Sequence, residues 1–155
     1  MKVKLKDVID HMGVEFEEYM PYICRRTGQL VVTSSRNLRD AEEMEEEEIA
    51  ALPEDRREEM ELAYDLVFNF EHYEKLPSSY DVNEYGMMED FCYSLPEGRT
   101  RDALLDAIDG KGAFRRFKNK IHDFDVVNQW YQFQNECYKQ KAIEWCRDVD
   151  LEYEE

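Results

Sequence analysis

The sequence predicts an α+β fold that is predominantly helical, with a small antiparallel β-hairpin near the N-terminus. Two observations predict this fold. Apolar residues recur every three or four positions through most of the chain, which is the spacing of amphipathic helices. Only residues 19–24 and 30–33 place β-branched and aromatic side chains on both sides of a short connection that contains Gly28. With 155 residues and no flexible linker, we expect one domain over residues 1–149 and an acidic tail at 150–155.

The N-terminal third is expected to contain a short helix, the hairpin and an acidic helical segment. Leu5, Val8 and Met12 fall on one side of a helix that should end at Gly13, since glycine readily adopts a left-handed backbone conformation. After the hairpin, residues 37–51 favour a helix but carry six closely spaced glutamates. Mutual repulsion of these carboxylates predicts a mobile stretch at residues 40–52.

The middle of the chain predicts one well-patterned helix and a short extended piece. Pro53 suits the start of a helix over residues 53–70, because proline is tolerated in the first turn. Its inward face is predicted to hold Met60, Ala63, Tyr64, Val67 and Phe70. Residues 73–76 should be extended before Pro77. Asp81 is then expected to cap the next helix, with Glu84 in the reciprocal position.

The C-terminal half predicts four helices in succession. The first covers residues 82–95 and stops before the turn signal Pro-Glu-Gly. Its apolar face is predicted to hold Tyr85, Met88, Phe91, Cys92 and Leu95. Helices over 101–109 and 113–124 follow, with Gly110 closing the former, and the longest helix should run over 127–149.

A basic and aromatic run at residues 110–118 stands out in a chain with a formal net charge of -17. Helical spacing places Phe114, Phe117, Ile121 and Phe124 on one seam, which we expect to be core. The cations have two interpretations: they neutralise the protein's own carboxylates, or they bind an external anion beside the two glycines and the helix N-terminus. The spacing is not that of a phosphate-binding Walker loop. The predicted anion- or partner-binding residues are Arg25, Arg26, Gly110, Lys111, Gly112, Arg115, Arg116 and Lys118.

Bulk composition bounds the partners and the compartment. The 37 acidic residues against 20 basic ones repel phosphate backbones, so the net charge disfavours nucleic acid, although a local cationic face acts within a Debye length of about 8 Å. No apolar run approaches the roughly 18 residues of a membrane span, and the N-terminus alternates charges. The four cysteines lack metal or disulfide-framework spacing. We therefore expect a cytoplasmic protein that makes no membrane contact.

Other constellations give weaker hypotheses. The three histidines are scattered, and we predict no metal site and no cofactor. Glu84, Glu89 and Asp90 are candidate acid-base or metal-binding carboxylates, although a solvated helix surface explains adjacent acids equally well. Four aromatic residues of the last predicted helix either belong to the core or stack nucleic-acid bases. They are Trp130, Tyr131, Tyr138 and Trp145.

Several segments together carry a family resemblance. They are residues 4–10, the Arg-Thr-Gly of the hairpin connection, residues 83–91, residues 110–118 and residues 142–145. On these segments the chain resembles an uncharacterised bacterial protein family of the UPF class, with a Gly-[Arg/Lys]-Gly-Ala-Phe-Arg-Arg-Phe-Lys run as its distinctive feature. The resemblance covers nearly the whole chain. It implies a bacterial, intracellular, single-domain protein and carries over no activity or catalytic residue.

The main functional hypothesis is a non-enzymatic interaction or regulatory module that docks an acidic protein or another anionic partner. Its motivation is local basicity within an acidic chain, because complementary fields tune encounter rate and orientation. One alternative is an RNA- or nucleotide-binding protein that uses the same cations with exposed aromatic side chains. The other is a small carboxylate- or metal-dependent hydrolase, which requires several carboxylates to converge in one pocket.

Overall fold

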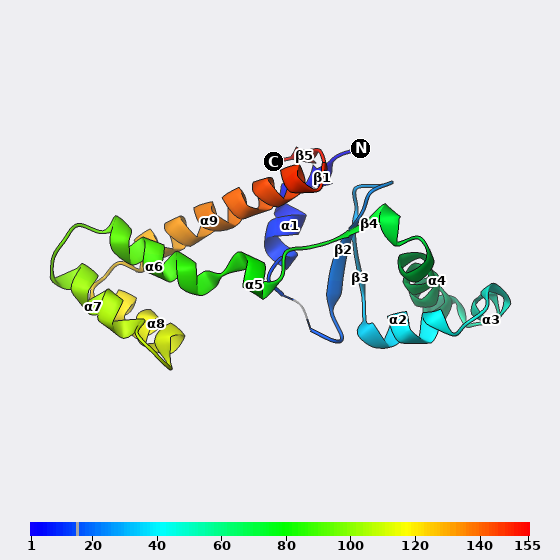
Figure 1. Cartoon of the computed structure of the whole chain (residues 1–155), viewed down its shortest axis with the longest axis horizontal. Helices are drawn as coiled ribbons and strands as arrows, with labels where there is room; N and C mark the ends of the chain where they lie inside the picture. The colour runs from blue at the N-terminus through cyan, green and yellow to red at the C-terminus, as the bar shows by residue number, and fades with distance from the viewer. Residues whose placement is uncertain (15) are drawn as a thin grey trace. The chain divides into compact units, whose positions relative to one another are not determined.

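The computed structural model describes residues 1–14 and 16–155. The chain divides into two compact units: unit 1 comprises residues 1–81 and 142–155, and unit 2 comprises residues 82–141. Short strands and many helices confirm the α+β class (Figure 1). The long helix α9 (Val127–Asp148) contributes residues to both units. Its position and length match the prediction.

Unit 1 contains a three-stranded antiparallel sheet with the order β3-β2-β4. Strands β2 (Met20–Cys24) and β3 (Leu30–Thr33) form the predicted hairpin. The extended piece expected before Pro77 is β4 (Tyr73–Lys75), which pairs with the other edge of β2. Composition identifies such a piece as extended, but only pairing with β2 makes it a third strand.

The two ends of the chain also pair within unit 1. Strand β1 (Val3–Lys4) lies parallel to β5 (Tyr153–Glu154), with Val3 opposite Tyr153. Val3 and Leu151 are buried. The final residues, expected to be a solvated acidic tail, are therefore attached to the fold, because an apolar residue among the acids packs inward and the strand pairing satisfies backbone groups.

Helix α1 (Leu5–His11) confirms the predicted N-terminal helix, and Gly13 has the positive φ of 76° expected after it. The single helix expected over 37–51 is wrong. Two helices occur instead, α2 (Ser35–Glu42) and α3 (Glu46–Ala50). Each has its own start signal, which explains the break. Ser34 caps α2 by accepting from the Asn37 amide at 3.1 Å, while Glu45 opens α3 through a capping box with Glu48.

Helix α4 (Glu54–Phe68) begins directly after Pro53. Met60 and Ala63 are buried as predicted, and they pack with Ala41 of α2 and Ile49 of α3. The expected burial of Phe70 is wrong, because the helix ends at Phe68 and Phe70 lies in the short 3₁₀ helix η1 (Phe70–His72), where it is 72% exposed.

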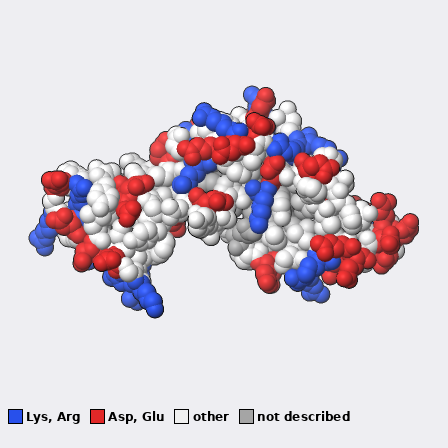
Figure 2. All heavy atoms as spheres, viewed as in Figure 1, with Lys and Arg blue, Asp and Glu red and all other residues white. Residues whose placement is uncertain are grey.

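The acidic segment is thus tied to α4 by its few apolar side chains. Its carboxylates face outward, and Figure 2 shows them gathered around α3. The mobility expected for residues 40–52 stays a prediction.

Helix starts between residues 78 and 84 differ from the predicted capping pair. Ser78 and Asp81 form a reciprocal cap for α5 (Ser79–Val82): the Ser78 amide donates to Asp81 Oδ2 at 3.1 Å, and the Asp81 amide donates to Ser78 Oγ at 3.2 Å. Asn83, with φ of 52°, then caps α6 (Glu84–Ser94) by accepting from the Gly86 amide. Capping of α6 by Asp81 is therefore wrong, since Asp81 is already inside the preceding turn.

Unit 2 consists of α6, α7 (Arg99–Ala107), α8 (Ala113–Asp123) and the first part of α9. Its core is a cluster of aromatic rings. Phe117 and Phe91 meet Trp130 edge-on, with centroid distances of 4.8 and 5.4 Å. Such edge-to-face contacts add to the stabilisation from area burial. Met88 and Cys92 of α6 are buried as predicted.

One member of the seam predicted for α8 is misplaced. Phe117 and Ile121 are each 1% exposed, but Phe114 is 48% exposed. The buried face of α8 runs through Ala113, Phe117 and Ile121, which are four residues apart. Phe114 lies about 100° around the helix from Ala113, at the edge of that face.

A polar cluster joins three elements of unit 1 around Asp65 of α4. Tyr73 of β4 donates its hydroxyl to Asp65 Oδ2, Asn69 Nδ2 donates to Oδ1 at 2.7 Å, and Arg26 Nη2 lies 3.0 Å from Oδ2. Burial by itself raises the pKa of Asp65, but the bonds from Tyr73 and Asn69 and the charge of Arg26 outweigh it and hold that pKa below its ordinary value of 3.8.

Replacement of this carboxylate should therefore have a pH-dependent cost. We expect Asp65→Asn to lower the free energy of unfolding at pH 7 by about 2 kcal/mol, because charge-assisted hydrogen bonds are lost. Since the folded pKa is depressed, the native stabilisation is present above pH 3.8 and disappears as the pH falls through the folded value. Urea unfolding at pH 7 and in steps below pH 4 should show the gap between wild type and variant closing. Glu58→Gln, at an exposed site on α4, is the control, and a gap that stays constant with pH contradicts the prediction.

Candidate functional site

The candidate site lies at the turn between α7 and α8 in unit 2. Gly110 and Gly112 both have positive φ, of 82° and 79°, so the turn uses conformations that favour glycine. Lys111, Arg115 and Lys118 are exposed. We call these three residues the basic patch. Figure 2 shows Lys and Arg side chains projecting from unit 2 where α7 gives way to α8.

Arg116 differs from its neighbours because its guanidinium is bound to the backbone of the turn. Nε donates to the Ala107 carbonyl at 2.8 Å and Nη2 donates to the Asp109 carbonyl at 2.7 Å. Nη1 donates to the Lys111 carbonyl, and Nη2 also lies 3.4 Å from the Gly110 carbonyl. These carbonyls belong to the last residue of α7 and to the turn after it, where helix geometry leaves acceptors unpaired.

Gly112 belongs to the same arrangement. A Cβ added at Gly112 would lie 2.9 Å from Arg116 Nη1, so the glycine leaves room for the guanidinium. Arg116 therefore has a role inside the fold, and its assignment to partner binding stays a prediction.

The basic patch has no carboxylate partner in the part of the chain that the structure describes. Lys111, Arg115 and Lys118 form no ion pair with any described residue. The hypothesis that these cations neutralise the protein's own carboxylates thus gains no support from an observed contact. Unit 2 is also nearly neutral in sequence, with nine basic and ten acidic residues, against eleven and twenty-seven in unit 1.

Arg25 and Arg26 lie in unit 1, in the connection of the β2–β3 hairpin, and both have internal partners. Arg25 donates to Glu74 Oε1 through Nε at 3.0 Å and Nη2 at 2.6 Å, and to the Val149 carbonyl. Arg26 pairs with Asp65 while its side chain remains 58% exposed. Their participation in one surface with the basic patch stays a prediction.

A small cavity opens beside the basic patch within unit 2. Three helices line it, and we call it the aromatic pocket. Its residues are Glu84 and Met88 of α6, Phe114, Phe117 and Lys118 of α8, and Trp130, Tyr131 and Gln134 of α9. The volume is about 140 Å³. Met88, Phe117 and Trp130 are buried, whereas Phe114 and Tyr131 are half-exposed.

Glu84 supplies the negative charge of the aromatic pocket. Its Oε1 accepts hydrogen bonds from Gln134 Nε2 at 2.7 Å and from the Tyr138 hydroxyl at 3.2 Å. Burial, together with the Glu84 carboxylate, raises the pKa of Tyr138 to about 12, so its hydroxyl remains a donor at neutral pH. Among the described residues Glu84 has no ion-pair partner.

The aromatic pocket brings together residues that the sequence analysis assigned to different roles: candidate acid, core, anion binding and base stacking. Tyr131 is exposed as base stacking would require, while Trp130 is core. Phe114 was expected in the core, and Gln134 has no sequence signal beyond its position three residues after Tyr131 on the same helix. Helical spacing pairs Phe114 with Lys118 on α8, but only tertiary packing brings Glu84 of α6 into the lining of the same cavity.

The structure gives no support to the remaining hypotheses from the sequence among the residues that it describes. Glu89 and Asp90 are exposed on α6. The described residues contain no group of three or more His, Cys, Asp or Glu side chains placed to hold a metal ion. Over the same residues, no helix has the length and apolar character needed to cross a membrane.

The bonds of Arg116 predict a specific stability loss. We expect Arg116→Met to lower the free energy of unfolding of unit 2 by about 2–3 kcal/mol, because several carbonyls lose a charged donor. Arg116→Lys should recover only part of this, since an ammonium lacks the planar fork. Urea unfolding can be followed by Trp130 fluorescence in a Trp145→Phe background, which leaves one tryptophan. Arg115→Met, on the exposed side, should change stability by less than about 0.5 kcal/mol. Equal losses for the two methionine variants would contradict the role of Arg116.

Comparison with known proteins places the chain in a family. The model of the Uncharacterised protein family (UPF0158) matches residues 2–154. A UPF0158 protein of Pseudomonas aeruginosa is 28% identical over 68 residues, which are 43% of this chain and 44% of the relative, so the match spans less than half of that bacterial protein. No solved structure matches the chain. The predicted resemblance to an uncharacterised UPF family is confirmed, while the Gly110–Lys118 run as its hallmark stays a prediction. Since the family model covers almost every residue, the chain belongs to UPF0158.

Proposed function

We propose that this protein is a non-enzymatic interaction or regulatory module that binds an anionic partner through the basic patch. The observation that carries the proposal is that neighbouring cations differ in their contacts. Arg116 is bound to the turn, whereas Lys111, Arg115 and Lys118 are exposed and lack ion pairs with described residues. Three like charges at close spacing repel one another, and an external anion relieves that repulsion.

The local backbone favours the same ligand. Arg115 and Lys118 are three residues apart on α8 and therefore neighbours on its surface. Lys111 lies in the turn that Arg116 closes, so its position is tied to the start of the same helix. Gly112 gives α8 no side-chain cap, which leaves the positive end of the helix dipole facing the turn.

The charge distribution sets the expected strength of binding. Unit 2 has almost no net charge, with nine basic and ten acidic residues, so the excess of carboxylates in the chain belongs to unit 1. Carboxylates farther away than about 8 Å are largely screened at physiological ionic strength. Contacts with an anion through exposed cations mainly accelerate and orient association, and they weaken as salt rises.

Two defined polyanions test this proposal. Fluorescence anisotropy with labelled poly-glutamate and with a labelled single-stranded RNA decamer, at 50 and 150 mM salt, should show salt-sensitive binding of at least one. We expect the double variant Arg115→Glu and Lys118→Glu to weaken that binding by at least about tenfold, because attraction is replaced by repulsion. Circular dichroism should remain that of the wild type.

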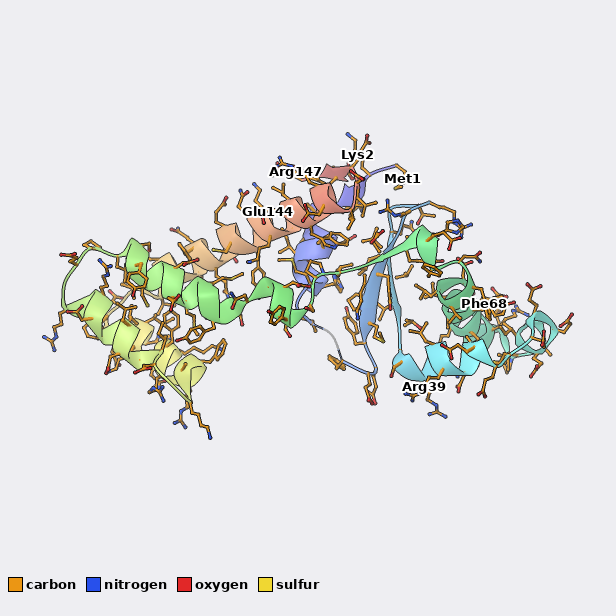
Figure 3. The ribbon with its side chains drawn as sticks, viewed as in Figure 1. Met1, Lys2, Arg39, Phe68, Glu144 and Arg147 are labelled. Carbon is orange, nitrogen blue, oxygen red and sulfur yellow. The ribbon has the colours of Figure 1, made fainter. Side chains whose placement is uncertain are left out.

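The matched control is the double variant Lys2→Glu and Arg39→Glu. It makes the same charge change with the same residue types on exposed sites of unit 1, and Figure 3 shows both side chains, with Arg39 pointing away from α2. Its binding should change less than about threefold. No binding to either polyanion, or an equal loss in the two double variants, would reject the basic patch as the docking site.

A further inference from the structure

The size of the aromatic pocket indicates what kind of group enters it. At about 140 Å³ it is well below the roughly 300–1,000 Å³ of pockets that enclose whole small molecules. An occupant therefore inserts one ring-sized group and leaves its remainder on the surface. Lys118 lines the pocket and also belongs to the basic patch, so that remainder emerges beside exposed cations.

The walls of the pocket suit a flat ring. Phe114 and Tyr131 are half-exposed, although both are large aromatic side chains, whereas Phe117 and Trp130 are buried. Aromatic side chains that remain accessible beside cations are the usual platform for unpaired nucleobases. A stacking ligand gives a function to two such rings at the entrance of one cavity.

Glu84 restricts which base fits. A carboxylate only accepts hydrogen bonds. Its Oε1 is taken by Gln134 and Tyr138, while Oε2 accepts no hydrogen bond from any described residue. Guanine presents two adjacent N–H donors, N1–H and the N2 amino group, along its Watson–Crick edge, and both can donate to Oε2, since a carboxylate oxygen has two lone pairs. Adenine and cytosine place an acceptor beside their amino donor, which would face the carboxylate with like polarity.

We propose that the aromatic pocket binds the guanine base of a nucleotide, with Glu84 reading its donor edge and Lys118 contacting its phosphate. The inference deepens the proposed function and rests on it, since the anion at the basic patch becomes a nucleotide phosphate. The same chemistry is available from free guanosine monophosphate and from an unpaired guanine in RNA.

Trp130 provides a direct readout, because it forms part of the pocket wall. In the full chain with Trp145→Phe, guanosine should quench Trp130 fluorescence saturably. Inosine, which lacks the N2 amino group, should bind more weakly than guanosine, and adenosine more weakly still. Absence of quenching by guanosine, or equal affinity for guanosine and adenosine, overturns the proposal.

Two variants test the walls of the pocket. Tyr131→Ala should weaken guanosine binding by at least about tenfold, as loss of a stacking platform does. Glu84→Gln keeps an oxygen that can accept from Gln134 and Tyr138 but should abolish the preference for guanosine over adenosine. Glu89→Gln, an exposed acid on the same helix, is the matched control and should leave both affinities unchanged. A preference that survives Glu84→Gln excludes the assigned reading of the base.

A variant of Lys118 distinguishes failure of this inference from failure of the proposed function. Guanosine monophosphate should bind more tightly than guanosine, and Lys118→Gln should erase the difference, whereas Lys120→Gln on the same helix should preserve it. If polyanions bind through the patch while guanosine fails to quench Trp130, the base pocket is wrong and anion docking stands. If guanosine binds but its phosphate adds nothing, the pocket stands and the basic patch is not an anion site.

A final arm identifies the source of the nucleotide. An RNA hexamer with one central guanine in a uridine background is compared with guanosine monophosphate. Tighter binding of the hexamer assigns the site to single-stranded RNA, and tighter binding of the monophosphate assigns it to a free nucleotide. Binding of poly-glutamate with no binding of either nucleotide ligand overturns the inference in favour of an acidic protein partner.

Discussion

The candidate site depends on how the guanidinium of Arg116 meets the backbone at the α7–α8 turn. Helix α7 ends with carbonyl groups that have no helical partner, and the turn that follows contains two glycines with positive φ. Arg116 reaches back from the first turn of α8 and donates to carbonyls from Ala107 to Lys111. One side chain therefore fixes both the turn and the start of the helix that presents the exposed cations.

The aromatic core of unit 2 adds a second constraint. Phe117 and Trp130 pack edge-on, and both residues also line the aromatic pocket. The pocket wall consequently has the rigidity of the core, while Phe114 and Tyr131 at the entrance remain accessible. A binding surface built on packed helices holds its geometry better than one built on a loop. The hydrogen bonds from Gln134 and Tyr138 likewise fix the Glu84 carboxylate.

The distribution of charge gives the two units different chemistry. Unit 1 carries most of the excess of carboxylates, and its cations at the hairpin are committed to Glu74 and Asp65. Unit 2 is nearly neutral and has exposed cations that lack such partners among the described residues. A net charge of -17 thus describes unit 1 far better than the surface around α8. The electrostatic field at that surface therefore depends on its local charge balance more than on the total charge of the chain.

The sequence by itself determined most of the local structure. Spacing of apolar residues located α1, α4, α6, α8 and α9, and the turn chemistry around Gly28 located the hairpin, because these signals act between residues that are close along the chain. Local signals were misread where two start signals competed. Ser34 caps α2 and Glu45 caps α3, so two helices replace the one expected over residues 37–51. Asp81 pairs with Ser78 at the start of α5 and therefore does not cap α6.

Tertiary structure alone decided which side chains share a site. Nothing near Arg116 in the sequence distinguishes it from Arg115, yet one is bound to the turn and the other is exposed, since helical rotation turns only Arg116 toward the end of α7. The contact of Glu84 with Gln134 joins residues fifty positions apart. Burial of a face depends on which helices pack together, so Phe114 became the edge of a pocket instead of core. Local signals in the sequence determined most of the helices, and packing determined which of their side chains are buried and which are exposed.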